Sequence, residues 1–149
     1  MVGLASFSVA LADPPVFLGP FHEEGTQVVA DCGSFQVIDN FELNYTVKLF
    51  FNNEGTLSRI IFEIWGTDTF SNSETGTAYS GDFRQSELVT VGQHGAHGGV
   101  IARLTVPGAG AVFLDVGRIV RDGAGNILFE AGQHQLADGD FADLCAALA

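Results

Sequence analysis

Positive charge is scarce in this chain. Of its 149 residues, 6 are lysine or arginine and 18 are aspartate or glutamate, so the formal net charge is −12. A phosphate backbone would be repelled by such a chain rather than neutralised, and nucleic acid is therefore not expected as a partner. An anionic membrane surface is disfavoured as a partner for the same reason.

Several signatures of other protein classes are also missing. Charged residues make up only 16% of the chain and apolar residues 46%, a balance that argues against disorder. The apolar first residues are too short to span a bilayer, and no other apolar run reaches that length. The length suits one domain with a real hydrophobic core, which we expect over residues 13–149.

Motifs for catalysis and cofactor binding are absent from the sequence. There is no G-x-S-x-G nucleophile elbow, no P-loop and no G-x-G-x-x-G turn between a strand and a helix. His94 and His97 have H-x-x-H spacing, but they lie in a glycine-rich segment and lack the glutamate of the zinc-protease motif. We therefore expect no metal site and no cofactor, and the sequence leaves open whether the protein is an enzyme.

The first twelve residues are apolar and uncharged. They end in Ala10-Leu11-Ala12, which has the small-x-small pattern of a signal-peptidase site, although a positively charged start is missing. We predict that residues 1–12 are a signal-peptide remnant, that the mature chain begins at Asp13 and that the protein is secreted. A native first strand is the alternative.

The chain has only two cysteines, Cys32 and Cys145. Neither has a second cysteine or a histidine at zinc-finger spacing. In an exported protein the default is one disulfide between them, and two buried free thiols are the alternative. A disulfide closing so long a loop would stabilise the fold by up to ~4–5 kcal/mol.

Polar and apolar residues alternate over residues 40–51. Phe41, Tyr45 and Phe51 share one parity, and the intervening positions are mostly polar, as in a long strand with one wet face. Further strands are expected over residues 57–65, 67–70, 77–83, 87–91, 100–106, 111–121 and 126–131. Turns are expected at residues 52–55, 72–76, 107–110 and 122–125, a glycine-rich loop at 92–99, and a helix over 141–148 begun by Asp140.

This order of elements predicts an all-β fold. Strands joined by short turns form an antiparallel meander, and a count of about eight favours closure into a barrel because closure removes exposed sheet edges. A short C-terminal helix would carry Cys145 to the segment around Cys32. An open sandwich is the alternative.

Charged residues interrupt several of the apolar strands. Glu63, Arg103 and Asp115 are candidates to orient a ligand if they face the interior of a small barrel, and Asp115 shares its parity with Phe113 and Ile119. A buried charge must be paired or hydrated. The alternative is that these charges point outward.

Aromatic residues with a polar atom form a second candidate set. Tyr45, Trp65 and Tyr79 each combine a large apolar surface with a donor, which suits the mouth of a pocket. A place in the core would suit them equally well. With Glu63, Arg103 and Asp115 they make up the predicted ligand-binding residues.

Three features together resemble a known group of proteins. They are the exported N-terminus, residues 115–126 (DVGRIVRDGAGN) and the ending at residues 143–148 (DLCAAL). The chain resembles small secreted β-proteins of actinobacteria whose function is uncharacterised. This resemblance implies export and the disulfide, and it transfers no catalytic residue. Only in architecture is the expected barrel similar to lipocalins and to allene oxide cyclase-like and dirigent proteins, and the lipocalin G-x-W start is missing.

Three functions are compatible with these features. The first is a secreted, disulfide-bonded barrel that binds a small apolar or aromatic molecule. The second is an isomerase or cyclase on the same barrel, similar to allene oxide cyclase. The third is an extracellular protein that assembles with copies of itself, since residues 111–121 are apolar on both faces.

Overall fold

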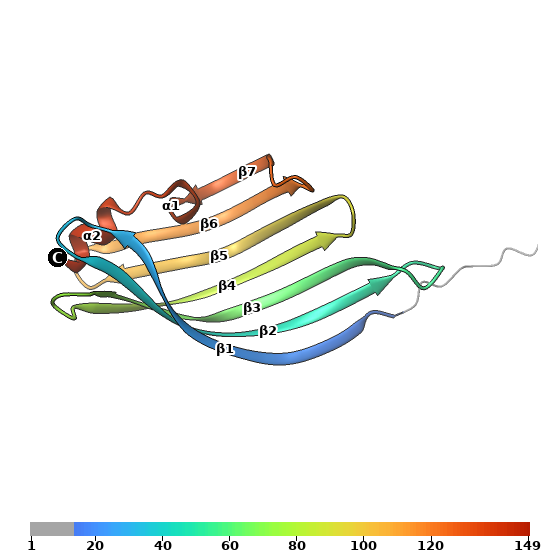
Figure 1. The fold of residues 1–149 in the computed structure, drawn as a ribbon, viewed down its shortest axis with the longest axis horizontal. Coiled ribbons are helices and arrows are strands. Elements are labelled where there is room, and N and C mark those ends of the chain that lie inside the picture. Colours follow the sequence, from blue (N-terminus) through green and yellow to red (C-terminus); the bar gives the residue numbers. More distant parts are fainter. Residues whose placement is uncertain (1–13) are drawn as a thin grey trace, which may run out of the picture.

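The computed structural model describes residues 14–149, and the predicted signal-peptide remnant at residues 1–12 lies outside them. Seven antiparallel strands form one sheet in chain order (Figure 1). The strands are Val16–Asp31 (β1), Gln36–Phe51 (β2), Leu57–Asn72 (β3), Ala78–Thr90 (β4), His94–Val106 (β5), Gly110–Asp122 (β6) and Ile127–His134 (β7). Two short helices follow, Gln135–Asp138 (α1) and Ala142–Leu148 (α2). Within residues 14–149, neither helix has the length and apolarity needed to cross a bilayer.

The predicted antiparallel meander with a short C-terminal helix is confirmed. There are seven strands rather than about eight, and within residues 14–149 the hydrogen-bonded ladder starts at β1 and ends at β7 without joining them. The result is a strongly curved sheet that forms a trough (Figure 1). At one end of the trough β1 sweeps across toward the helices, so the two sides come together there.

Several local predictions were wrong. The strands expected over residues 57–65 and 67–70 are one strand, β3, and those expected over residues 77–83 and 87–91 are one strand, β4. The segment 92–99 is not a loop, because only its first two residues lie in a turn and His94–Val106 is a continuous strand. The glycine-rich composition predicted a loop, but pairing with β4 on one side and β6 on the other holds this segment in an extended strand. The helix is confirmed, but Phe141 occupies its N-cap position and no side chain caps it, so Asp140 does not have the predicted role.

The first strand was not predicted at all. β1 covers a segment with mixed composition and begins after two prolines, and its ladder to β2 is interrupted at Gly19-Pro20. Proline has no N–H to donate to a ladder, so it is tolerated only at a sheet edge or an irregularity. β1 meets this condition because it is an edge strand.

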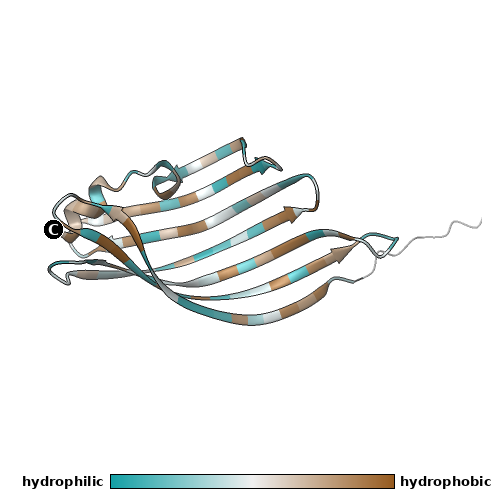
Figure 2. Ribbon diagram, in the orientation of Figure 1, coloured by the Kyte–Doolittle hydropathy of each residue, from teal (hydrophilic) through white to brown (hydrophobic). Residues whose placement is uncertain are grey.

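Alternation along the strands gives the sheet two distinct faces, visible as alternating brown and teal segments in Figure 2. Directly paired residues point to the same face. The register therefore places Tyr45 of β2 and Ile64 of β3 together on the inner face of the trough, and Lys48 and Ile61 on the outer face. On that outer face Lys48 Nζ lies 3.3 Å from Glu63 Oε1.

The hydrophobic core fills one end of the trough, which we call the closed end. Its members come from five of the strands, from the β1–β2 turn and from α2: Ala30, Phe35, Val37, Phe70, Ala102, Leu104, Val106, Val112, Phe113, Leu144 and Leu148 are all buried. The β3–β4 turn is fixed to the C-terminus there, because Asn72 Nδ2 donates to the Leu148 carbonyl over 3.0 Å.

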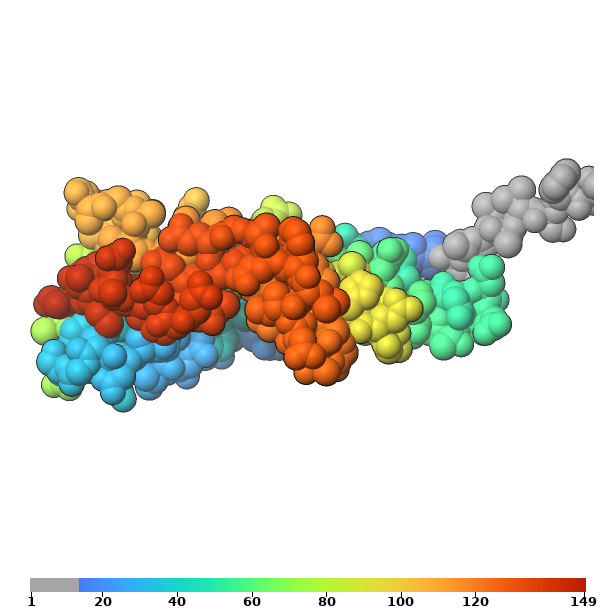
Figure 3. Space-filling view, turned by 90° about the horizontal axis from the view of Figure 1, so that it is seen from above, coloured from blue at the N-terminus to red at the C-terminus, as the bar shows by residue number. Residues whose placement is uncertain are grey.

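The predicted disulfide is confirmed and also lies at the closed end. Cys32 and Cys145 are bonded across a sequence separation of 113 residues, with their Cα atoms 5.7 Å apart. Figure 3 shows the result: the two helices, in red, lie against the cyan segment that contains residue 32. The bond joins the end of β1 to α2 and so connects the two sides of the trough.

A row of three paired glycines runs across the last three strands of the sheet, β5, β6 and β7. Gly99 of β5 pairs with Gly117 of β6, which pairs in turn with Gly132 of β7. Gly117 and Gly132 have φ values of 147° and 123°, which side chains rarely adopt. A Cβ atom on Gly117 would collide with the Ala131 carbonyl oxygen. The backbones therefore approach each other closely along this row, which leaves no space for side chains.

Candidate functional site

The inner face of the sheet encloses a hollow of ≈ 460 Å³ next to the closed-end core. Its walls are mainly apolar, and all strands except β7 contribute to it. The lining residues are Glu23, Gln27, Val29, Asp39, Phe41, Leu43, Tyr45, Phe62, Ile64, Asp68, Phe70, Phe83, Gln85, Ile101, Ala102, Phe113 and Leu136. The size and the few polar groups are typical of a pocket for a small molecule.

Two aspartates are buried in this apolar wall. Asp39 of β2 is 3% exposed and Asp68 of β3 is 8% exposed. Asp68 pairs directly with Phe41, and Asp39 pairs with Phe70, so the two carboxylates are diagonal neighbours on the inner face. Adjacent strands therefore place two acids together in an environment that disfavours charge.

The two oxygen atoms of the Asp39 carboxylate differ in their hydrogen bonds. Gln27 Nε2 donates to Asp39 Oδ2 over 3.0 Å. The other oxygen of Asp39, Oδ1, is buried without a hydrogen-bond partner within residues 14–149. Most buried polar atoms have a partner, so an unpartnered oxygen on a residue that lines a hollow can accept a hydrogen bond from a ligand donor.

Burial and mutual repulsion shift the protonation of this pair. Burial raises the pKa of Asp68 to about 7, and the nearby charge of Asp39 adds to the rise. Burial also raises the pKa of Asp39, an effect that the hydrogen bond from Gln27 partly offsets. The pair therefore holds a proton in mildly acidic solution and loses it close to neutrality.

A second polar group lies on the β1 side of the hollow. The Tyr45 hydroxyl donates to Glu23 Oε1 over 3.0 Å, and the Tyr45 ring lies 5.1 Å from that of Phe21. The hydrogen bond to Glu23 raises the pKa of Tyr45. Because this hydroxyl already has a carboxylate partner, Tyr45 contributes mainly its ring face to the hollow.

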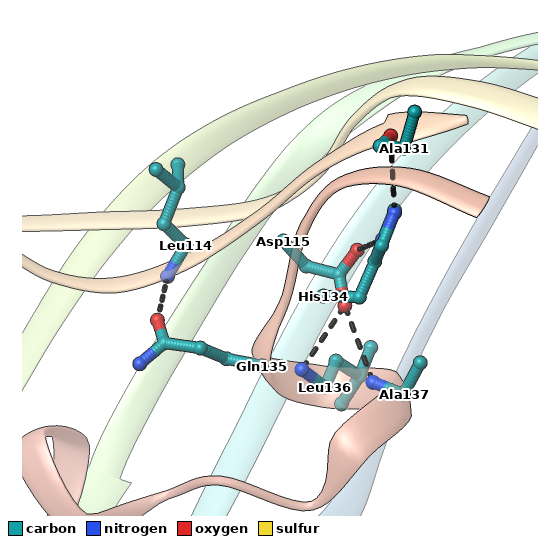
Figure 4. A network of polar contacts seen from close by, with 7 residues as sticks. All are labelled: Leu114, Asp115, Ala131, His134, Gln135, Leu136 and Ala137. Carbon is teal, nitrogen blue, oxygen red and sulfur yellow. Dashed lines mark hydrogen bonds and ion pairs between the residues drawn. The ribbon is translucent and has the colours of Figure 1, made fainter. Parts of the chain in front are cut away.

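A different pair of buried charges connects β6, β7 and α1 (Figure 4). Asp115 Oδ1 lies 3.2 Å from His134 Nδ1, and Asp115 Oδ2 accepts the backbone N–H groups of Leu136 and Ala137 over 3.0 and 3.2 Å. His134 Nε2 lies 3.3 Å from the Ala131 carbonyl oxygen. Every polar atom of this pair has a partner, so its role is to hold α1 against the sheet.

The protonation of His134 follows from these contacts. Burial lowers the pKa of His134, but the hydrogen bonds to Asp115 and to the Ala131 carbonyl together outweigh burial, and the net pKa is raised. Both ring nitrogens face acceptors, an arrangement that only the imidazolium form satisfies on both sides. These contacts therefore favour the imidazolium form of His134.

The structure disperses the six predicted ligand-binding residues. Only Tyr45 lines the hollow. Tyr79 packs against the closed-end core, and Asp115 lies in the buried pair with His134. The other three, Glu63, Trp65 and Arg103, have the parity of the outer face, where Glu63 is paired with Lys48.

Sequence reasoning missed the two aspartates of the hollow, although a signal was present. Asp39 has the parity of Val37 and Phe41, and Asp68 has the parity of Ile64 and Phe70. Each is thus a charge on the apolar face of its strand. The strand predicted over residues 40–51 began one residue after Asp39. Asp68 fell in a separate short strand predicted over residues 67–70, so its shared parity with Ile64 was not used.

The paired histidines do not form a metal site. His94 and His97 are three residues apart on the single strand β5, so their side chains point to opposite faces of the sheet. No cluster of three or more histidine, cysteine, aspartate or glutamate side chains suited to a metal occurs within residues 14–149.

No protein-family model, no curated protein and no solved structure matches this chain. The all-β antiparallel sheet agrees with the resemblance expected from residues 115–126 and 143–148, but these comparisons give no support to the family itself.

Proposed function

We propose that this protein binds one small, mainly apolar molecule in the hollow of its sheet. One observation carries the proposal: the inner face holds an apolar hollow of ≈ 460 Å³, and one of the few polar residues that line it, Asp39, has a buried carboxylate oxygen without a hydrogen-bond partner within residues 14–149. Side chains of the core close one end of the trough, so a ligand would enter from the other. Apolar walls supply affinity, and the few polar groups fix orientation.

A fluorescent alcohol, naphthalen-1-ylmethanol, tests this proposal. Wild-type protein should bind it saturably. The chain offers a matched pair of variants on one strand, because Ile64 lines the hollow and Ile61 has the opposite parity. Ile64→Gln should weaken binding about tenfold or more, because a polar amide then takes the place of an apolar side chain in the wall of the hollow. Ile61→Gln should leave the affinity within about twofold of wild type. No saturable binding, or equal weakening in both variants, would overturn the proposal.

We also propose that the protein is exported and works outside the cell. The Cys32–Cys145 disulfide supports this, since such bonds persist in oxidising compartments. Mass spectrometry of protein collected from the medium of its native host should give a chain that starts at Asp13 with both thiols oxidised. Protein found only inside the cell, with both thiols reduced, would contradict export.

A second candidate function, an isomerase or cyclase in the same hollow, is favoured by the protonation of Asp68. A pKa of about 7 is suited to a general acid or base at neutral pH. Native mass spectrometry separates the two functions. A carrier purified from its host should show a discrete extra mass under native conditions only, whereas a catalyst with a transient substrate should be free of one.

A further inference from the structure

The hollow carries negative charge with no protein cation to balance it. Glu23, Asp39 and Asp68 line it, and among the described lining residues there is no lysine, arginine or histidine. The charged form of a buried carboxylate is costly unless a counter-charge or hydrogen bonds compensate it. Either a proton or a bound cation must therefore accompany the two aspartates.

We infer that the ligand is a small apolar amine, whose protonated nitrogen lies between Asp39 and Asp68. This inference rests on the function proposed above and names the class of ligand. An ammonium group has three N–H donors and no acceptor. It can satisfy the orphaned Oδ1 atom of Asp39 and a carboxylate oxygen of Asp68 at the same time, which a single hydroxyl cannot do.

The walls next to the two acids suit the rest of such a molecule. Phe41 pairs with Asp68, Phe70 pairs with Asp39, and Phe83 and Phe113 also line the hollow. Phenylalanine faces attract cations and bury hydrocarbon, so they can contact both parts of an organic amine. A bare metal ion prefers six or more oxygen ligands and gains nothing from such walls.

The same charges act against other ligand classes. A fatty or aromatic carboxylate would bring a further negative charge toward Glu23, Asp39 and Asp68 in an environment of low dielectric. A neutral alcohol would meet only the apolar walls and one hydrogen-bonding group. The order of affinity should therefore be amine, then alcohol, then carboxylate.

Three probes with the same aromatic body test this order: naphthalen-1-ylmethanamine, naphthalen-1-ylmethanol and 1-naphthoate. At about pH 8, where Asp68 is largely ionised, the amine should bind at least about tenfold more tightly than the alcohol, a difference of about 1.4 kcal/mol. At about pH 5 the preference should shrink, since Asp68 then holds a proton. Glu23 and Tyr45 are the other titratable groups that line the hollow, and Tyr45 donates to Glu23.

Variants separate the site from the general attraction of an acidic protein for cations. Asp39→Asn with Asp68→Asn should abolish the preference for the amine while the alcohol still binds. Asp82→Asn is the control, because it also removes one negative charge but from an exposed position on the outer face of the sheet. There Thr67 Oγ1 donates to Asp82 over 3.0 Å. This variant should keep the preference for the amine. The single variant Asp39→Asn keeps Asp68 and should lose most of the preference for the amine. It replaces the double variant in the test if the double variant does not fold.

Each other outcome overturns the inference. If the alcohol binds and the amine binds no more tightly, the ligand is not an amine, although the function proposed above still stands. If the preference for the amine remains in Asp39→Asn and in the double variant, the net negative charge of the protein causes it, and the two aspartates do not. If neither the amine nor the alcohol binds, both the inference and the proposed function fail.

Discussion

The Nδ1 atom of His134 lies 3.2 Å from Oδ1 of Asp115, and each side chain is only 1% exposed. The two residues pair directly across β6 and β7, and the second oxygen of Asp115 accepts two backbone N–H groups at the start of α1. One carboxylate thus holds the last strand and the first helix together. Removing His134 would leave the buried Asp115 carboxylate with only the two backbone N–H groups of Leu136 and Ala137.

We expect His134→Ala to lower the free energy of unfolding by about 3 kcal/mol or more, because it leaves the Asp115 carboxylate uncompensated. Urea denaturation measures this. The matched control is His22→Ala, which removes an exposed histidine whose ring contacts Asn44 over 3.2 Å and should cost less than about 0.5 kcal/mol. Equal losses of unfolding free energy in the two variants would show that His134 does not stabilise the buried Asp115 carboxylate.

The protonation of Asp68 predicts how stability changes with pH. Its pKa rises from 3.8 in the unfolded chain to about 7 in the fold, so the native state binds the extra proton between these values and stability falls as pH rises through that range. Asp68→Asn is neutral at every pH. The variant should match wild type near pH 4 and be about 2–4 kcal/mol more stable near pH 8. A difference between the two proteins that does not change with pH would contradict the shift.

The disulfide should contribute much of the stability. Because it closes a loop of 113 residues, replacing both Cys32 and Cys145 with serine should lower the free energy of unfolding by about 4 kcal/mol. Denaturation of the wild type in the presence of a reductant should reproduce the loss. An unchanged denaturation midpoint in the reduced protein would argue that the core holds α2 in place without the bond.

The glycine row can be tested with two alanine substitutions. Gly117→Ala places a Cβ atom against the Ala131 carbonyl at a φ of 147°, and we expect a loss of more than about 3 kcal/mol or no folded protein. Gly95→Ala is the control, because its Cβ would lie 3.7 Å from the nearest atom, an ordinary contact. Thermal melting distinguishes them, and similar melting temperatures would exclude a close approach of β6 and β7.

The sequence supports the local elements better than their arrangement. Alternation over residues 41–51 identified β2 because one of its faces is buried and the other is wet. Residues 94–99 carry no such pattern, since three of them are glycine, and they become a strand only because β4 and β6 pair with them on both sides. Such pairing depends on residues far away in the chain.

The candidate site shows the same division. The disulfide could be predicted from two cysteines alone, but the acids of the hollow could not be brought together without the register between β2 and β3. Parity marks Asp39 and Asp68 as unusual on their own strands. Their proximity is a property of the pairing, because a slip of one residue would turn one of them to the other face.

The unpaired edges of β1 and β7 give the hollow a freedom that a barrel lacks. In a closed barrel the number of strands and their stagger fix the radius. In this sheet no ladder hydrogen bond joins β1 to β7 within residues 14–149, and the covalent bond Cys32–Cys145 connects the two sides at the closed end. We therefore expect the width of the mouth to follow the size of its guest without loss of a ladder hydrogen bond, while the disulfide holds the closed end.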